Sequence, residues 1–159
     1  PVFGWAKPVP VNPYNLRDPR RDNIWISAAG PLSNISVAFV SFLAILLLKL
    51  IRPGVVDFLR NFLLGQGSRQ PGFYPLEGIA LILFYAVLVN TYLAVFNLIP
   101  VPPLDGSGVL MGLLPLEAAQ RYERIRPFGF IIVLFMIYIG VLDIIIRPIQ
   151  LLIFAFIFG

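Results

Sequence analysis

The stretch FNLIPVPPLDG, Phe96–Gly106, holds the residues best suited to chemistry. Its prolines end a long apolar segment, fix the backbone and remove N–H donors just before the carboxylate of Asp105. Asp-Gly pairs are common in turns, so Asp105 taken alone is most simply a turn residue facing headgroup water. Irregular backbone at membrane depth, however, occurs only where protein buries it or water reaches it. The stiff break and the nearby amide of Asn97 therefore indicate a candidate metal or substrate site.

A second group of candidate residues lies in SAAGPLSN, Ser27–Asn34. Its alanines, its serines and Gly30 are small enough to let two helices approach closely in a bilayer. Pro31 suits the first turn of a helix or a kink. Asn34 would then face a neighbouring helix or a cavity. Tight packing explains this stretch as well as a functional role does.

Three further polar positions lie within apolar segments. Asn90 and Thr91 are expected to make hydrogen bonds between helices. Asp143 fits either an ion pathway or, better, a helix-surface pair with Arg147, which follows it at the i+4 spacing.

The composition is that of a membrane protein. The chain is 58% hydrophobic and 13% charged with a mean hydropathy of +0.87, whereas soluble domains are about 45–50% apolar and about 25% charged. Ile24–Lys49, Gly78–Ile99 and Phe128–Ile146 are long and apolar enough to span a bilayer as helices. Pro148–Phe158 is apolar but short, which fits a half-span, an interfacial segment or a truncated helix. We therefore expect an all-α polytopic membrane protein with three to four transmembrane helices.

The chain divides into three parts by pattern. Residues 1–23 are polar and punctuated by prolines that exclude a helix, and Trp5 and Tyr14 suit a membrane interface. This part is predicted to be an extended or hairpin membrane-associated loop. Residues 24–127 hold the two first spans with their connectors, including a short amphipathic helix in VVDFLRNFLL and a helix from the LPLEAAQRYERIRP connector. Residues 128–159 form the C-terminal transmembrane segments.

Several functions are excluded by what the chain lacks. It contains no cysteine and no histidine, which removes thiolate catalysis, cysteine-bound metals and the usual general base. Its net charge of +4 and pI near 9.8 come from basic residues that flank apolar spans. Lipid headgroups therefore explain the charge better than nucleic acid does. The first residue is Pro1, and the simplest interpretation is a fragment that lacks its beginning.

Basic residues also predict the orientation. If each span crosses once, the N-terminal segment and the 107–127 connector share one side and the 49–77 linker lies on the other. The first side holds Lys7, Arg17, Arg20, Arg21, Arg121, Arg124 and Arg126, and the second holds Lys49, Arg52, Arg60 and Arg69. The positive-inside rule therefore predicts that the Asp105 region faces the cytoplasm.

Three motifs together resemble one known family. GWAKPVPVNP (Gly4–Pro13), SAAGPLSN and FNLIPVPPLDG, in this order, are similar to motifs of the site-2 protease family of intramembrane zinc metalloproteases. The resemblance covers roughly residues 1–127. It implies one zinc ion, bound by two histidines of a His-Glu-x-x-His helix and one aspartate of a later helix, and substrates that are membrane-embedded peptide segments.

The resemblance also implies roles for individual residues. Asp105 matches the aspartate that serves as the third zinc ligand. Asn97 matches an asparagine that stabilises the oxyanion or orients the scissile carbonyl. Asn34 matches a residue of the active-site groove, and we place its neighbours Gly30 and Pro31 with it as substrate-binding residues.

The GWAKPVPVNP segment matches an extended loop that pairs with the unwound substrate as an added strand. This implies that Val9 and Val11 bind substrate. The chain departs from the family because His-Glu-x-x-His is absent. In the family that motif precedes this segment, so we expect the two histidine ligands and the general base upstream of this chain.

The expected protein is therefore the C-terminal part of a zinc metalloprotease in a bacterial plasma membrane, with partners limited to the bilayer and membrane-embedded substrates. The fragment alone is expected to be inactive. One alternative is a non-catalytic pseudoprotease or membrane chaperone that binds transmembrane segments without cutting them. Another is a piece of a transporter or channel in which Asp105, Asn97 and Asp143 line a polar path, and this predicts inverted repeats that the sequence does not show.

Overall fold

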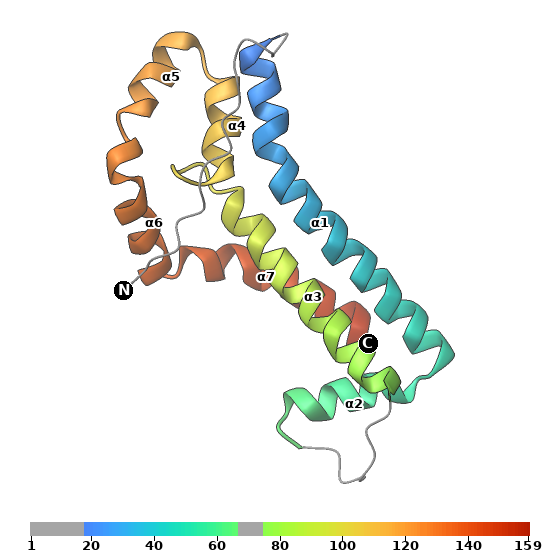
Figure 1. The fold of residues 1–159 in the computed structure, drawn as a ribbon. Coiled ribbons are helices and arrows are strands. Elements are labelled where there is room, and N and C mark those ends of the chain that lie inside the picture. Colours follow the sequence, from blue (N-terminus) through green and yellow to red (C-terminus); the bar gives the residue numbers. More distant parts are fainter. Residues whose placement is uncertain (1–17, 67–74) are drawn as a thin grey trace, which may run out of the picture.

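The computed structural model describes residues 18–66 and 75–159, and every regular element in that part is a helix (Figure 1). The helices are α1 (Pro19–Ile51), α2 (Gly54–Leu63), α3 (Pro75–Asn97), α4 (Asp105–Leu113), α5 (Leu116–Glu123), α6 (Gly129–Tyr138) and α7 (Val141–Phe158), with a short 3₁₀ turn over Arg126–Phe128. Three of them, α1, α3 and α7, are long and apolar enough to cross a membrane. The prediction of an all-α polytopic membrane protein is confirmed.

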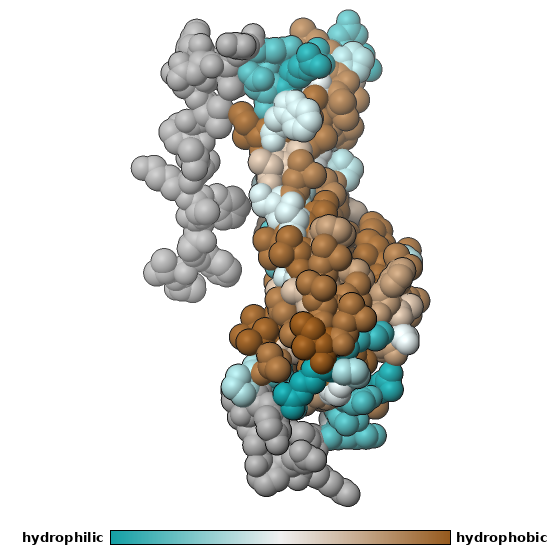
Figure 2. Space-filling view, turned by 90° about the vertical axis from the view of Figure 1, so that its right-hand side faces the viewer, coloured by the Kyte–Doolittle hydropathy of each residue, from teal (hydrophilic) through white to brown (hydrophobic). Residues whose placement is uncertain are grey.

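The surface has the polarity of a membrane protein. Hydrophobic side chains cover the middle of the molecule and hydrophilic ones gather at both ends (Figure 2). Many large apolar side chains are exposed, for example Trp25 and Tyr138 at 66% and 87% of their area. Such exposure is costly in water and ordinary in lipid, because lipid tails are as apolar as the side chains.

Helix α1 begins earlier than the sequence predicted. The Asp18 side chain accepts hydrogen bonds from the backbone N–H groups of Arg20 and Arg21, at 3.1 and 3.2 Å. Aspartate at this position is a strong N-cap. Residues 19–23, assigned above to the N-terminal loop, are therefore helical, and Pro31 lies buried well inside α1 rather than in its first turn.

The core lies where α1, α2, α3 and α7 meet. Helices α1 and α3 run side by side in opposite directions, and α2 connects their lower ends (Figure 1). The fully buried side chains here include Ile45, Leu59, Phe84 and Ile157. Helix α2 is amphipathic, as predicted, because Val55, Val56 and Leu59 are buried while its charged side chains are exposed.

The predicted third span is broken in two. Gly140 has a φ of +75°, a left-handed conformation that glycine adopts without strain, and it separates α6 from α7. The single helix expected over Phe128–Ile146 is therefore wrong. Helix α7 instead continues through Pro148 to Phe158, so the short apolar tail belongs to a candidate span.

Two predictions about polar side chains are also wrong. Asn90 Nδ2 donates to the Ala86 carbonyl at 2.8 Å, a bond within α3 and not between helices. The acid at Asp143 lies exposed in the first turn of α7, where a negative charge suits the helix dipole. In the part of the chain that is described, no ion pair joins it to Arg147.

Candidate functional site

Asp105 is the first residue of α4 and follows the proline break. Helix α3 ends at Asn97, and residues 98–104 form irregular turns that include a cis Pro102–Pro103 bond. Local hydrogen bonds hold the end of this segment, since the Leu104 N–H donates to Val101 O at 3.0 Å. The break therefore fixes where α4 begins and, with it, the Cα of the carboxylate.

The glycine after Asp105 has a packing reason. A Cβ on Gly106 would clash with the backbone carbonyl of Leu98, because the first turn of α4 lies directly against the first residues of the break. Gly106 itself is buried. The Asp-Gly pair thus reflects a close backbone approach and not only turn chemistry.

The two motifs singled out in the sequence meet at Asp105. A Cβ added to Gly30 would lie 2.9 Å from Asp105 Oδ2, so the carboxylate rests on α1 where that helix has no side chain. The residues are far apart in the chain and come together because α4 packs on the first half of α1. Gly30 is therefore in contact with the candidate ligand.

The contact continues along an antiparallel seam between α1 and α4. Glycines on α4 leave room for α1, since a Cβ on Gly108 would clash with Ser27 and one on Gly112 would clash with Ile24. Asn23 Nδ2 also donates to the Gly108 carbonyl at 3.3 Å. Sequence reasoning missed both glycines, although their four-residue spacing is the small-xxx-small pattern of close helix pairs.

The other predicted site residues have more varied surroundings. Asn34 lies one helical turn beyond Gly30 and shares its face of α1, and its side chain is partly exposed. Asn97 is partly exposed at the end of α3. Within residues 18–66 and 75–159, no hydrogen bond joins either amide to Asp105. Val9 and Val11 lie outside the described residues.

A tyrosine from α5 reaches the break from the other direction. The Tyr122 hydroxyl donates to the Pro100 carbonyl at 2.7 Å. A Cβ on Gly129, at the start of α6, would clash with the Pro102 carbonyl. Neither residue carried a sequence signal, because nothing in a polar connector indicates which loop it will contact.

Burial changes the acidity of two side chains at this site. Desolvation raises the pKa of Asp105 above its ordinary value, since the charged form loses water. The pKa of Tyr122 is raised by burial first and by the negative charge of Glu123 second, while an interaction with the Ser107 side chain lowers it. Both shifts follow from the packing of α4 and α5 around the break.

The donor set fits part of a zinc site. Catalytic zinc takes three protein ligands and a water molecule. Among the described residues, no group of three or more histidine, cysteine, aspartate or glutamate side chains could hold a metal ion. Asp105 is a carboxylate donor on a backbone that the break positions, so it fits as one ligand, and the described residues do not form a zinc site by themselves.

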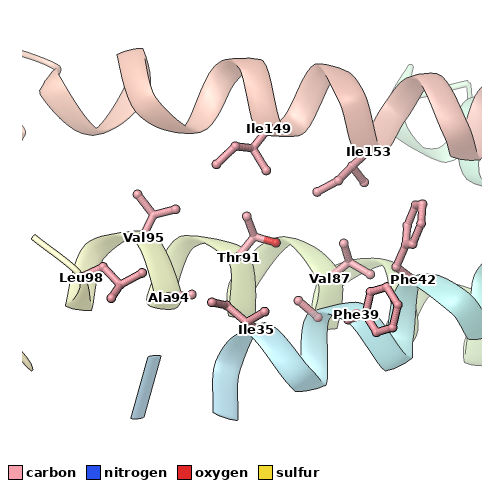
Figure 3. Close-up of a pocket in the computed structure, with 11 residues that line it drawn as sticks. Ile35, Phe39, Phe42, Val87, Thr91, Ala94, Val95, Leu98, Ile149 and Ile153 are labelled. Atoms are coloured by element: carbon pink, nitrogen blue, oxygen red, sulfur yellow. The ribbon is translucent and has the colours of Figure 1, made fainter. Parts of the chain in front are cut away.

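A separate apolar pocket of about 410 Å³ lies between α1, α3 and α7 (Figure 3). Ile35 and Phe39 line it from α1, Val95 from α3 and Ile153 from α7. Thr91 is the one polar residue in its lining. Neither the candidate ligand nor the two asparagines belong to this pocket, so it is not the candidate site.

The motifs and their meeting place agree with one family of proteins. A family model described as Peptidase family M50 matches residues 10–140, and the chain belongs to this family. The match confirms the resemblance to site-2 proteases.

Individual relatives agree with that class. A Bacillus subtilis (strain 168) protein named "Putative zinc metalloprotease YwhC" is 33% identical over 134 residues, which cover 83% of this chain and 53% of the relative. A Methanocaldococcus jannaschii protein named "Putative zinc metalloprotease MJ0611" is 32% identical over 111 residues, which cover 69% of this chain and 45% of the relative. The chain thus spans about half the length of these relatives. No solved structure shows a significant match.

Proposed function

We propose that this chain is part of an intramembrane zinc metalloprotease and that Asp105 supplies one of the zinc ligands. The carrying observation is the contact between Asp105 Oδ2 and the Gly30 position, 2.9 Å from where a Cβ would lie. A side chain that only capped a turn would need no such space on a neighbouring span. Two histidine ligands and a general base would come from a His-Glu-x-x-His helix outside residues 1–159.

Different residues of this chain would take different roles in the reaction. Zinc, when bound, would supply a Lewis acid and a water of lowered pKa. Asp105 would hold its carboxylate at a fixed distance from the break. Asn97, at the end of α3, would donate its amide hydrogen bond to the scissile carbonyl oxygen. Asn34 would line the groove beside it, while Val9 and Val11 would lie in the strand that pairs with an unwound substrate.

The test is a substitution in the natural protein that contains this chain. Asp105→Ala is expected to lower zinc content well below one ion per molecule and to abolish cleavage of a transmembrane peptide, because catalytic zinc takes three protein ligands and this variant would lack one of them. Zinc is measured by mass spectrometry and cleavage by gel. Glu117→Ala is the matched control, since this acid is exposed on α5.

The outcomes separate the possible functions. Full zinc content and full cleavage after Asp105→Ala would contradict the proposal. Binding of the transmembrane peptide by the unsubstituted protein, without zinc and without cleavage, would instead support the non-catalytic pseudoprotease or membrane chaperone.

A further inference from the structure

The irregular segment between α3 and α4 is held partly by residues of other helices. Its prolines carry no N–H group, so the segment cannot form a regular hydrogen-bonded structure. Its carbonyl groups still need donors. The Pro100 carbonyl receives one from the Tyr122 hydroxyl at 2.7 Å.

Tyr122 also lies beside the first turn of α4. Its hydroxyl also interacts with the side chain of Ser107, which is buried. Ser107 Oγ in turn donates to the Leu104 carbonyl at 2.7 Å, immediately before Asp105. The tyrosine therefore contacts the chain on both sides of the carboxylate, at Pro100 before it and at Ser107 after it.

A second contact from the same connector acts on the same segment. Gly129 begins α6 and packs so closely on the Pro102 carbonyl that a Cβ there would clash. Gly129 and Pro102 are both buried. Helix α5 and the first residue of α6 thus contact the break at two points, once through a hydrogen bond and once through close packing.

We infer that Tyr122 is a positioning residue for Asp105, which holds the proline break so that the carboxylate stays in place against α1. Tyr122 does not need to touch zinc or substrate for this role. The effect on zinc rests on the proposed function, whereas the effect on the break does not.

The experiment removes only the hydroxyl group of Tyr122. Tyr122→Phe keeps the ring but removes the donor to the Pro100 carbonyl. Hydrogen exchange of the 98–108 amides is expected to become faster, and the zinc Kd to rise about tenfold, as for other residues that hold a metal ligand in place. Tyr138→Phe is the matched control, because Tyr138 is 87% exposed on α6.

One further measurement and one further pair of variants keep the test decisive. Circular dichroism must show the same helix content in both variants, so that faster exchange is local. If Tyr122→Phe changes overall folding, Glu123→Gln keeps the tyrosine and should leave the 98–108 amides protected, while Gly129→Ala should expose them. Unchanged exchange at 98–108 in folded Tyr122→Phe would overturn the inference.

The two proposals fail in different ways. If the unsubstituted protein binds no zinc, the proposed function fails, and exchange at 98–108 still decides the role of Tyr122. If zinc binds and Asp105→Ala removes it, but Tyr122→Phe alters neither exchange nor zinc Kd, only the positioning role is overturned.

Discussion

The contact between Asp105 and Gly30 depends on the absence of a side chain at Gly30 as well as on the carboxylate of Asp105. Glycine inside a helix costs about 1 kcal/mol relative to alanine, and Gly30 lies well within α1. The atom that an added Cβ would meet is the end of a rotatable side chain, Asp105 Oδ2. The fold can therefore accommodate alanine here by turning the carboxylate away.

This predicts opposite effects on stability and function for Gly30→Ala. The unfolding temperature should stay level or rise, because alanine favours the helix. The zinc Kd should rise about tenfold, because the displaced carboxylate no longer lies where the metal needs it. Thermal unfolding in detergent and a zinc titration measure the two effects.

Gly54→Ala is the control, since a Cβ at Gly54 would meet no atom within 4 Å. It should leave zinc binding unchanged. A Gly30→Ala protein that is less stable but binds zinc normally would mean that Gly30 serves helix packing and not the carboxylate.

At the scale of elements, the α1–α4 seam is built from glycine against small side chains. A Cβ on Gly108 would clash with Ser27 Oγ. Gly108→Ala should therefore destabilise the protein by about 1–3 kcal/mol, the usual cost of overpacking. Thermal unfolding of the purified protein measures the loss.

A second substitution tests whether that clash is the cause of the lost stability. Ser27→Gly removes the obstacle, so the double variant should recover much of the lost stability, and the two changes should not be additive. Ser33→Gly is the control on the same helix, because Ser33 Oγ bonds to Ala29 O within α1. Equal rescue by both serine changes would contradict the seam as described.

The sequence predicted the elements with continuous apolar patterns and missed their interruptions. The spans of α1 and α3 and the amphipathic α2 follow from composition and periodicity. The break at Gly140 did not, because isoleucine, leucine and valine continue on both sides of it and a positive φ leaves no mark in hydropathy. The predicted start of helix α1 lies too far along the chain, because the first turn of this helix is charged and apolar patterning does not reveal it.

The candidate site was predicted in its parts but not in its assembly. Motif spacing identified Asp105 and Gly30 separately, while their contact depends on how α4 folds back on α1. Tyr122 and Gly129 could not be found at all, since a contact between a polar connector and a distant loop is set by tertiary packing. The roles of Asn97 and Asn34 stay predictions.

At the scale of the whole molecule, the basic residues and the fold agree on two distinct ends. The start of α1 and the α4–α5 connection lie at one end, and α2 lies at the other (Figure 1). Arg20 and Arg21 lie in the first turn of α1, and Arg121 and Arg124 lie at the end of α5, which follows that connection. We propose that this end faces the cytoplasm of a bacterial plasma membrane.

Single cysteines can test this orientation, because the chain has none of its own. In intact bacterial spheroplasts, a membrane-impermeant maleimide should label Gln66→Cys and not Glu117→Cys. Both positions are exposed. Inverted vesicles should give the reverse pattern and serve as the control, and labelling of Glu117→Cys from outside would contradict the proposed orientation.

The contact between Gly30 and Asp105 also has a consequence for biosynthesis. The ribosome makes the α1 half of the contact about 75 residues before the α4 half, which is roughly 4–15 s at 5–20 residues per second. During that interval α1, which is long enough to cross a membrane, has been made without the carboxylate that contacts Gly30. The carboxylate can reach Gly30 only after α3 and the proline break have also been made. A nascent chain halted before α4 would therefore hold the Gly30 half of the contact without its carboxylate.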